Sequence, residues 1–348
     1  MEEKEFRSRI YWITSFFSIL VIWLHSFNGE LFLGATKSGA WVDELERTLG
    51  RLGQMAVPGF FMVSSYLFYR GFTWKKLVPK WRSRIKSLLI PYVLWNLLYY
   101  IGYVIATRLP GISHVIGKDP VDFNLEQGVL AVLHHAYNPV FWYLYQLILL
   151  VALAPVIYVL CKSTWGGGIW LLTLMAALWQ NWDLQILNMD ALFYTCVAAY
   201  VSLHRDSWGK AAEGSTEGGN PWILSLVLVF ILGILVFLGQ PGRVLYERAL
   251  LTVLGRLWCV CAAWISSGYM KFPRVRDWMK HNFFLYAIHF AWVRLFNKVG
   301  ALVLPEHPAS ALFMFFLMPV FMVALSTWAK RGLMYMAPGI FQLLSGGR

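Results

Sequence analysis

Four ionisable side chains stand inside apolar stretches of the sequence, where charge is costly and usually functional. His25 lies near the end of an apolar run that begins at Ile10, and His289 lies in FFLYAIHF. Arg256 lies in GRLWCVCAAW, and Arg294 follows His289 by five residues. A neutral imidazole can take a proton from a hydroxyl group, and an arginine can stabilise negative charge that develops on a carbonyl oxygen. These residue types fit general-base catalysis, with His25 as the base.

A polar stripe accompanies His25 on the first predicted helix. Thr14, Ser18, His25 and Asn28 fall close to one face at helical spacing. Asn28 or Glu30 is placed to orient the imidazole. Counting about 1.5 Å per residue puts His25 roughly 22 Å above the inner membrane boundary. A structural, hydrogen-bonded histidine is the alternative interpretation.

The other three ionisable residues lie at intermediate heights, roughly 10 to 18 Å above the inner face by the same count. If they converge on His25, the bundle encloses an aqueous cavity that opens to the outside. His289 has a structural alternative, in which its ring bonds a backbone carbonyl. Arg294 has another, in which it reaches the outer interface together with Lys298.

These residues must be positioned by membrane helices, because the composition excludes an ordinary soluble protein. Hydrophobic residues make up 58% of the 348 residues and charged residues only 14%, and the mean hydropathy is +0.55. A bilayer core of about 30 Å needs roughly 20 apolar residues per helix. The sequence therefore predicts an all-α, polytopic membrane bundle in a single domain over 1–348. Its ten predicted helices are 10–28, 52–69, 87–107, 141–160, 166–180, 189–203, 222–239, 246–269, 282–300 and 309–328.

The distribution of basic residues predicts the topology, because cytoplasmic flanks of membrane helices collect Lys and Arg. With the N-terminus inside, 20 basic residues fall on the cytoplasmic side and seven on the other side. Both termini are therefore predicted to be cytoplasmic, in a multi-pass protein of the cell membrane. The net charge of +12 reflects this bias and contact with anionic membrane lipid rather than nucleic-acid binding.

The predicted cytoplasmic loop 70–86 carries seven positive charges and no acid. Positive-inside bias is one explanation, and a site for polyphosphate is the other, since Arg and Lys bind phosphate groups. A basic cytoplasmic entrance below a polar cavity suggests an anionic acyl donor such as a coenzyme A thioester. The four cysteines lack metal-ligand spacing, so neither a metal nor a permanently bound cofactor is expected.

The chain resembles the acyltransferase-3 family of integral membrane acyltransferases over nearly its whole length. The segments that carry the resemblance are LVIWLHSF, VPGFFMVSSYL, RIKSLLIPYVLW, FWYLYQLILLVALAP, FFLYAIHF and the terminal LLSGGR. The resemblance implies a bundle of about ten helices that uses cytoplasmic acyl-CoA to acylate a hydroxyl, commonly on a sugar or glycan. Acetyl is the expected acyl group, and a sugar, a glycan such as a polysaccharide, or another cell-envelope molecule is the expected acceptor.

The family's functional residues map onto this chain only in part. Its first-helix histidine maps onto His25, and its basic residues at the start of the third helix map onto Arg84 and Lys86. Many members carry an arginine eleven residues before the histidine, where this chain has Thr14. Arg256 or Arg294 is the candidate replacement.

Two other classes of function remain open at this stage. A transporter of small polar substrates would also enclose a polar cavity, although no inverted repeat is evident. A noncatalytic relative that binds lipid or glycan would account for Thr14. The sequence names neither the acceptor nor an oligomeric state.

Overall fold

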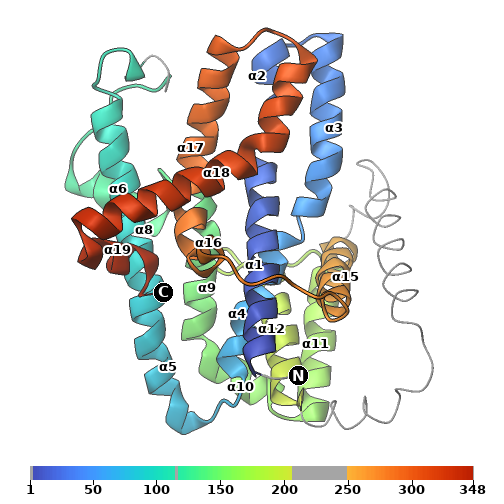
Figure 1. Ribbon diagram of the computed structural model, residues 1–348. Helices are drawn as coiled ribbons and strands as arrows, with labels where there is room; N and C mark the ends of the chain where they lie inside the picture. Colours follow the sequence, from blue (N-terminus) through green and yellow to red (C-terminus); the bar gives the residue numbers. More distant parts are fainter. Residues whose placement is uncertain (1–2, 114–116, 206–248, 348) are drawn as a thin grey trace. The chain divides into compact units, whose positions relative to one another are not determined.

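The structure is a computed structural model that describes residues 3–113, 117–205 and 249–347. All regular secondary structure in these residues is helical (Figure 1), which confirms the all-α class. The chain forms two compact units. Unit 1 comprises Met1–Leu24, Arg47–Lys80 and Leu149–Lys280, and unit 2 comprises His25–Glu46, Trp81–Ile148 and His281–Arg348.

Unit 1 is built around the contact between α4 and α12. The helices that lie wholly in it include α4 (Ala56–Tyr69), α10 (Ala154–Cys161), α11 (Thr164–Trp179), α12 (Met189–Leu203) and α15 (Ala249–Ser267). The Ser65 hydroxyl of α4 donates to the Thr195 carbonyl of α12 over 2.7 Å, and both side chains are buried. Helix α1 (Glu3–His25) packs on α4, where a Cβ added to Gly59 would come within 2.2 Å of the Phe17 ring. Glycine is therefore required for this approach.

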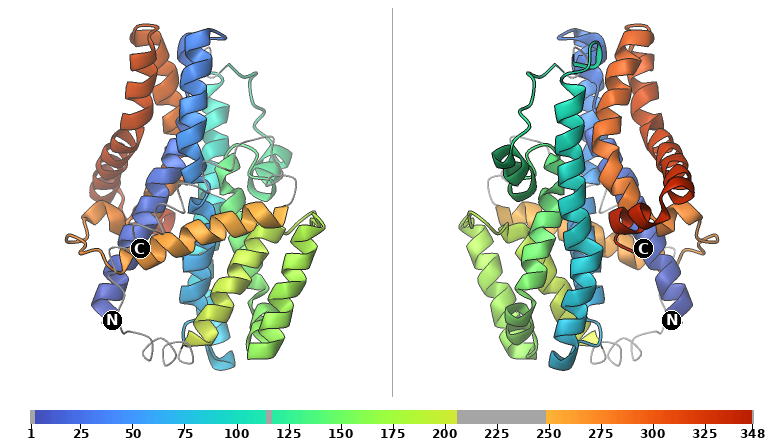
Figure 2. Two further views of the ribbon diagram at one scale, coloured as in Figure 1. Left: turned by 90° about the vertical axis from the view of Figure 1, so that its right-hand side faces the viewer. Right: turned by 90° about the vertical axis from the view of Figure 1, so that its left-hand side faces the viewer.

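Unit 2 is built around α17, which packs beside α18 (Figure 2). Its helices include α2 (Gly29–Leu33), α6 (Ile90–Ala106), α8 (Leu125–Leu133), α17 (Asn282–Val303), α18 (Pro308–Met336) and α19 (Pro338–Ser345). Tyr99 of α6 donates to the Ala287 carbonyl of α17 over 3.0 Å, and Trp95 donates to the Leu344 carbonyl of α19 over 2.9 Å. These bonds tie α17 and α19 to α6.

Four described helical segments are long and apolar enough to cross a membrane, and a bent pair makes a fifth. The four are Glu3–Leu33, Trp74–Ala106, Ala249–Gly268 and Pro308–Met336. The bent pair lies over the predicted segment 141–160, which the structure divides into two helices. Helix α9 (Trp142–Ala152) meets α10 at 64°, because Pro155 lacks an N–H and its ring would clash with the preceding turn.

The count of ten spans and the cytoplasmic position of both termini stay predictions. The segment 222–239 lies outside the described residues, and each of the other nine predicted segments is mainly helical in the part that the structure describes. Within unit 1, α15 lies crosswise to α11 and α12 (Figure 2). The helices of this unit therefore cannot all run along one membrane normal, and helix length alone does not establish the topology.

Three predicted loops contain helices that hydropathy did not indicate. Helix α3 (Lys37–Gly53) follows the first predicted span, and α8 lies in the predicted external segment 108–138. The basic loop 70–86 is largely helical, since α5 (Leu77–Arg84) continues through a π turn (Ile85–Leu89) into α6. These helices carry charge or are short, so the search for apolar runs misses them.

The topology can be tested with single cysteines at three exposed positions. Cysteines in place of Lys76 and Lys280 should resist a membrane-impermeant thiol reagent in intact cells, because basic flanks stay cytoplasmic. A cysteine in place of Lys118 should react. All three should react after the cells are permeabilised, and labelling of the first two in intact cells would contradict the predicted orientation.

Candidate functional site

His25 and His289 lie together in unit 2. Their ring centroids are 5.4 Å apart with the planes tilted by 40°, and the Phe290 ring meets His25 edge-on, also at 5.4 Å. His25 is the last residue of α1 and is half-buried, whereas His289 is fully buried in α17. Among the described residues the His25 ring has no hydrogen-bond partner, so ring packing alone holds it.

The tautomer of His289 follows from its hydrogen bond. Its Nδ1 lies 2.5 Å from the Tyr286 carbonyl oxygen, which can only accept, so Nδ1 carries the proton. In a neutral imidazole Nε2 is then an acceptor, and within the described residues this buried atom has no hydrogen-bond partner. The expected bond to a backbone carbonyl is present, yet it leaves one nitrogen of His289 available beside His25.

The chain leaves the helical path directly after His25. Residues 26–28 are not helical, because Ser26, Asn28 and Gly29 are poor helix formers and Asn28 has φ −147° and ψ 1°. Asn28 is therefore not one helical turn above His25, and the predicted stripe ends at the imidazole. The Asn28 side-chain amide instead donates to the Asn297 Oδ1 over 3.3 Å.

Buried polar groups hold this helix break in place. The Glu46 Oε2 of α3 accepts the backbone N–H groups of Asn28 and Gly29 over 2.9 and 3.1 Å, and this side chain is 0% exposed. Asn297 donates to the Ser26 carbonyl over 3.1 Å. Glu30, which the sequence offered as an orienting acid, is exposed. The acid that shapes the site is Glu46.

Glycine lets α3 approach closely enough to bring Glu46 to the break. A Cβ on Gly29 would lie 3.0 Å from the Asp43 backbone nitrogen and 3.1 Å from Val42 Cγ1. The two amide groups of the break would otherwise be buried donors without an acceptor, which is costly. The close approach of α2 and α3 thus fixes where the first helix ends and where His25 stands.

The candidate cavity residues Arg294, Arg256 and Thr14 do not all lie in the same unit. Arg294 is in unit 2, and its guanidinium lies 5.3 Å from the centroid of the Phe290 ring that packs on His25. Arg256 is in unit 1, where it lies 3.5 Å from Asp190 Oδ2 and donates to Gln54 Oε1 over 2.8 Å. Thr14 is also in unit 1, and its hydroxyl donates to the Ile10 carbonyl over 2.8 Å. Arg294 is therefore the stronger candidate for charge stabilisation at His25.

Arg84 and Lys86 lie where α5 meets the π turn, both in unit 2. Arg84 is half-buried and Lys86 is exposed. A π turn is rare and is often associated with a functional site. Gly346, near the C-terminus, packs on this π turn, since a Cβ on Gly346 would lie 2.6 Å from the Ser87 carbonyl oxygen.

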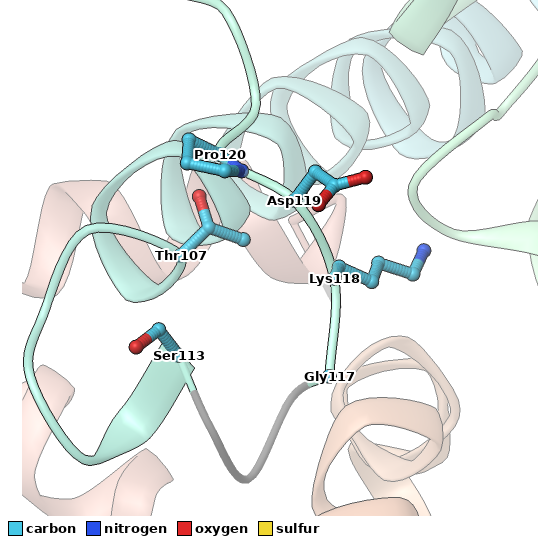
Figure 3. Close-up of a pocket in the computed structure, with 6 residues that line it drawn as sticks. All are labelled: Thr107, Ser113, Gly117, Lys118, Asp119 and Pro120. Atoms are coloured by element: carbon cyan, nitrogen blue, oxygen red, sulfur yellow. The ribbon is translucent and has the colours of Figure 1, made fainter.

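The described residues contain no cluster of three or more histidine, cysteine or acidic side chains that could hold a metal. A surface hollow lies at the connection after α6, where Lys118 and Asp119 extend to the same side (Figure 3). Its described lining residues are Thr107, Ser113, Gly117, Lys118, Asp119 and Pro120. The Thr107 hydroxyl donates to the Tyr103 carbonyl and accepts from the Val121 amide. None of these lining residues is a histidine, so the hollow is separate from the His25–His289 pair.

The helices and the histidine pair define an integral membrane protein with a candidate acid–base site. A family profile described as an acyltransferase domain matches residues 10–331. The chain therefore belongs to the acyltransferase-3 family, which supports a membrane acyltransferase. No curated protein and no solved structure matches it.

Sequence reasoning missed Glu46 and Asn297. Asn297 follows His289 by eight residues, so both lie on one face of α17, and this spacing was visible in the sequence. Glu46 carried no such signal, because it lies in a segment that was predicted to be an external loop.

Proposed function

We propose that the protein transfers an acyl group, with acetyl as the expected group, from cytoplasmic acyl-CoA to a hydroxyl of a sugar, glycan or other cell-envelope acceptor. The observation that carries this proposal is the His25 ring. It is half-buried, has no hydrogen-bond partner among the described residues, and is held against His289 and Phe290. Such a ring can accept a proton from a bound hydroxyl without first breaking another bond.

The proposed reaction is direct transfer. His25 takes the proton of the acceptor hydroxyl while the hydroxyl oxygen attacks the thioester carbonyl carbon. The carbon–sulfur bond of the thioester then breaks. The coenzyme A sulfur leaves with the electron pair and takes up a proton, which His25 can return. Arg294 is the proposed group for the negative charge on the acyl oxygen, because it lies on the Phe290 side of His25.

His289 is proposed to position His25. Its available Nε2 can accept an N–H from the His25 ring after a small movement, which would leave the other His25 nitrogen to act as the base. The pair would then resemble the base and orienting group of other acid–base sites.

Arg84 and Lys86 are proposed to hold the phosphate groups of the donor. Replacing both by glutamine should raise the KM for acyl-CoA at least about tenfold, because charge-assisted contacts to phosphate are lost. Steady-state kinetics and calorimetric titration of free coenzyme A measure the effect. The variant Arg84→Lys with Lys86→Arg keeps the charges and should retain most of the affinity. An unchanged KM would leave only a topological role for these residues.

The function can be tested with the purified protein in vesicles and acetyl-CoA labelled in its acetyl group. Label transferred to an added glycan, or thioester hydrolysis without one, supports the enzyme. Tight binding of coenzyme A without turnover would support a noncatalytic relative. Accumulation of an unmodified solute inside sealed vesicles would instead support a transporter.

A further inference from the structure

A groove of about 560 Å³ runs between α6 and α17 in unit 2. Its size is that of a small-molecule site. Helix α17 presents two separate faces at this point. His289, Val293, Asn297 and Gly300 are buried on one face, whereas Trp292, Leu295 and Val299 line the groove on another. His289 therefore lies on a different face of α17 from these groove walls, whereas Arg294 lines the groove and also lies beside the Phe290 ring that packs on His25.

The walls of the groove are apolar and aromatic, and several of them are exposed. Leu98 is 45% exposed, Trp292 41% and Val299 45%. Helix α6 belongs to a segment of membrane-spanning length, so an exposed apolar surface here faces hydrocarbon chains. Tyr99 and Tyr103 also line the groove, and aromatic rings of this kind gather at the membrane interface.

The groove also contains three cations, Lys118, Arg294 and Lys298, and none of the described residues that line it is acidic. Lys118 Nζ lies 4.8 Å from the centroid of the Tyr103 ring, so the aromatic wall holds the ammonium in place. Arg294 and Lys298 are four residues apart and share one side of α17. A ligand must combine long apolar chains with a negative head to match this lining.

We infer that the groove binds an anionic phospholipid from the surrounding bilayer. Its phosphate lies among Lys118, Arg294 and Lys298, and its acyl chains lie along the aromatic and aliphatic walls. A zwitterionic lipid of equal chain length fits less well, because its own cation opposes these three. The inference does not depend on acyl transfer and can be tested without a donor.

The test uses two variants that leave Arg294 unchanged, since Arg294 is also proposed to act at His25. Lys118→Gln with Lys298→Gln removes two of the cations. Gly102→Leu fills the apolar part of the groove, which Gly102 lines. A Cβ at Gly102 would meet nothing within 4 Å, so the larger side chain enters the groove without a clash at Cβ. Both variants should fold, which melting temperature confirms.

Each protein is reconstituted in vesicles of equal parts phosphatidylcholine and phosphatidylglycerol. Native mass spectrometry then counts the retained lipids, and spin-labelled phosphatidylglycerol gives the relative affinity. Wild-type protein should retain phosphatidylglycerol in preference to phosphatidylcholine. Each variant should lower that preference at least about tenfold, while Lys118→Arg with Lys298→Arg keeps it.

A matched loss of charge controls for a general effect on net charge. Lys37→Gln with Arg331→Gln removes two exposed cations of unit 2 that lie outside the groove. This variant should keep the preference of the wild-type protein. Equal retention of the two lipids by the wild-type protein, or an unchanged preference in both groove variants, would overturn the inference.

Discussion

Replacing His25 by alanine should lower turnover at least about a hundredfold while the protein still folds and binds coenzyme A. Removal of a general base typically costs between a hundredfold and ten-thousandfold in rate. The ring is half-buried and makes no hydrogen bond among the described residues, so its loss should disturb the fold little. Turnover with labelled acetyl-CoA, melting temperature and coenzyme A titration measure the three properties.

Three further measurements separate a base from a structural histidine. Added imidazole should restore part of the turnover of His25→Ala, since a free base can occupy the vacated space. Wild-type turnover should fall in acid, because a protonated imidazole cannot accept a proton. His289→Ala should lower the melting temperature more and turnover less, because this side chain is fully buried. A stable His25→Ala protein with near-normal turnover would favour the noncatalytic relative.

Replacing Glu46 by alanine should destabilise unit 2 by about 2 to 5 kcal/mol, because two buried N–H groups lose a charged acceptor. Those groups belong to Asn28 and Gly29, and the carboxylate is 0% exposed. Hydrogen exchange should show lost protection of these two amides. Turnover should fall as well, since the chain directly after His25 would no longer be held.

Two neighbouring variants provide the controls for Glu46. Glu46→Gln keeps a carbonyl oxygen that can accept and should lose less stability. Glu44→Ala removes an exposed acid from the same helix and should change stability by less than about 0.5 kcal/mol. Protection of Asn28 and Gly29 that survives Glu46→Ala would show that another group fixes the helix break.

The main helices and the two histidines were predictable because each depends on a local signal. A long apolar run identifies a helix wherever it packs, and the predicted apolar segments are mainly helical in the residues that the structure describes. An imidazole within such a run is conspicuous, because placing an ionisable side chain in an apolar environment costs free energy. His25 and His289 were therefore found, although their contact joins residues that are far apart in sequence.

The surroundings of His25 were not predictable because they depend on tertiary contacts. The helical spacing that joined His25 to Asn28 assumed that α1 continues, but α1 ends at His25. The end is fixed by Glu46 and Asn297, which come from two other helices. Arg256 and Arg294 looked equivalent in sequence, yet Arg256 pairs with Asp190 in unit 1. Only the fold distinguishes such residues.

The π turn between α5 and α6 lets this helix hold one extra residue without turning its two ends relative to each other. A residue added to a regular α-helix would turn everything beyond it by about 100°, and a π turn accommodates one more residue than an α turn. A single deletion within Ile85–Leu89 that restored regular α-helix would therefore leave Arg84 on roughly the same side of α6. Relatives that lack one residue here would need a gap in the alignment, yet would direct their basic side chains to the same place.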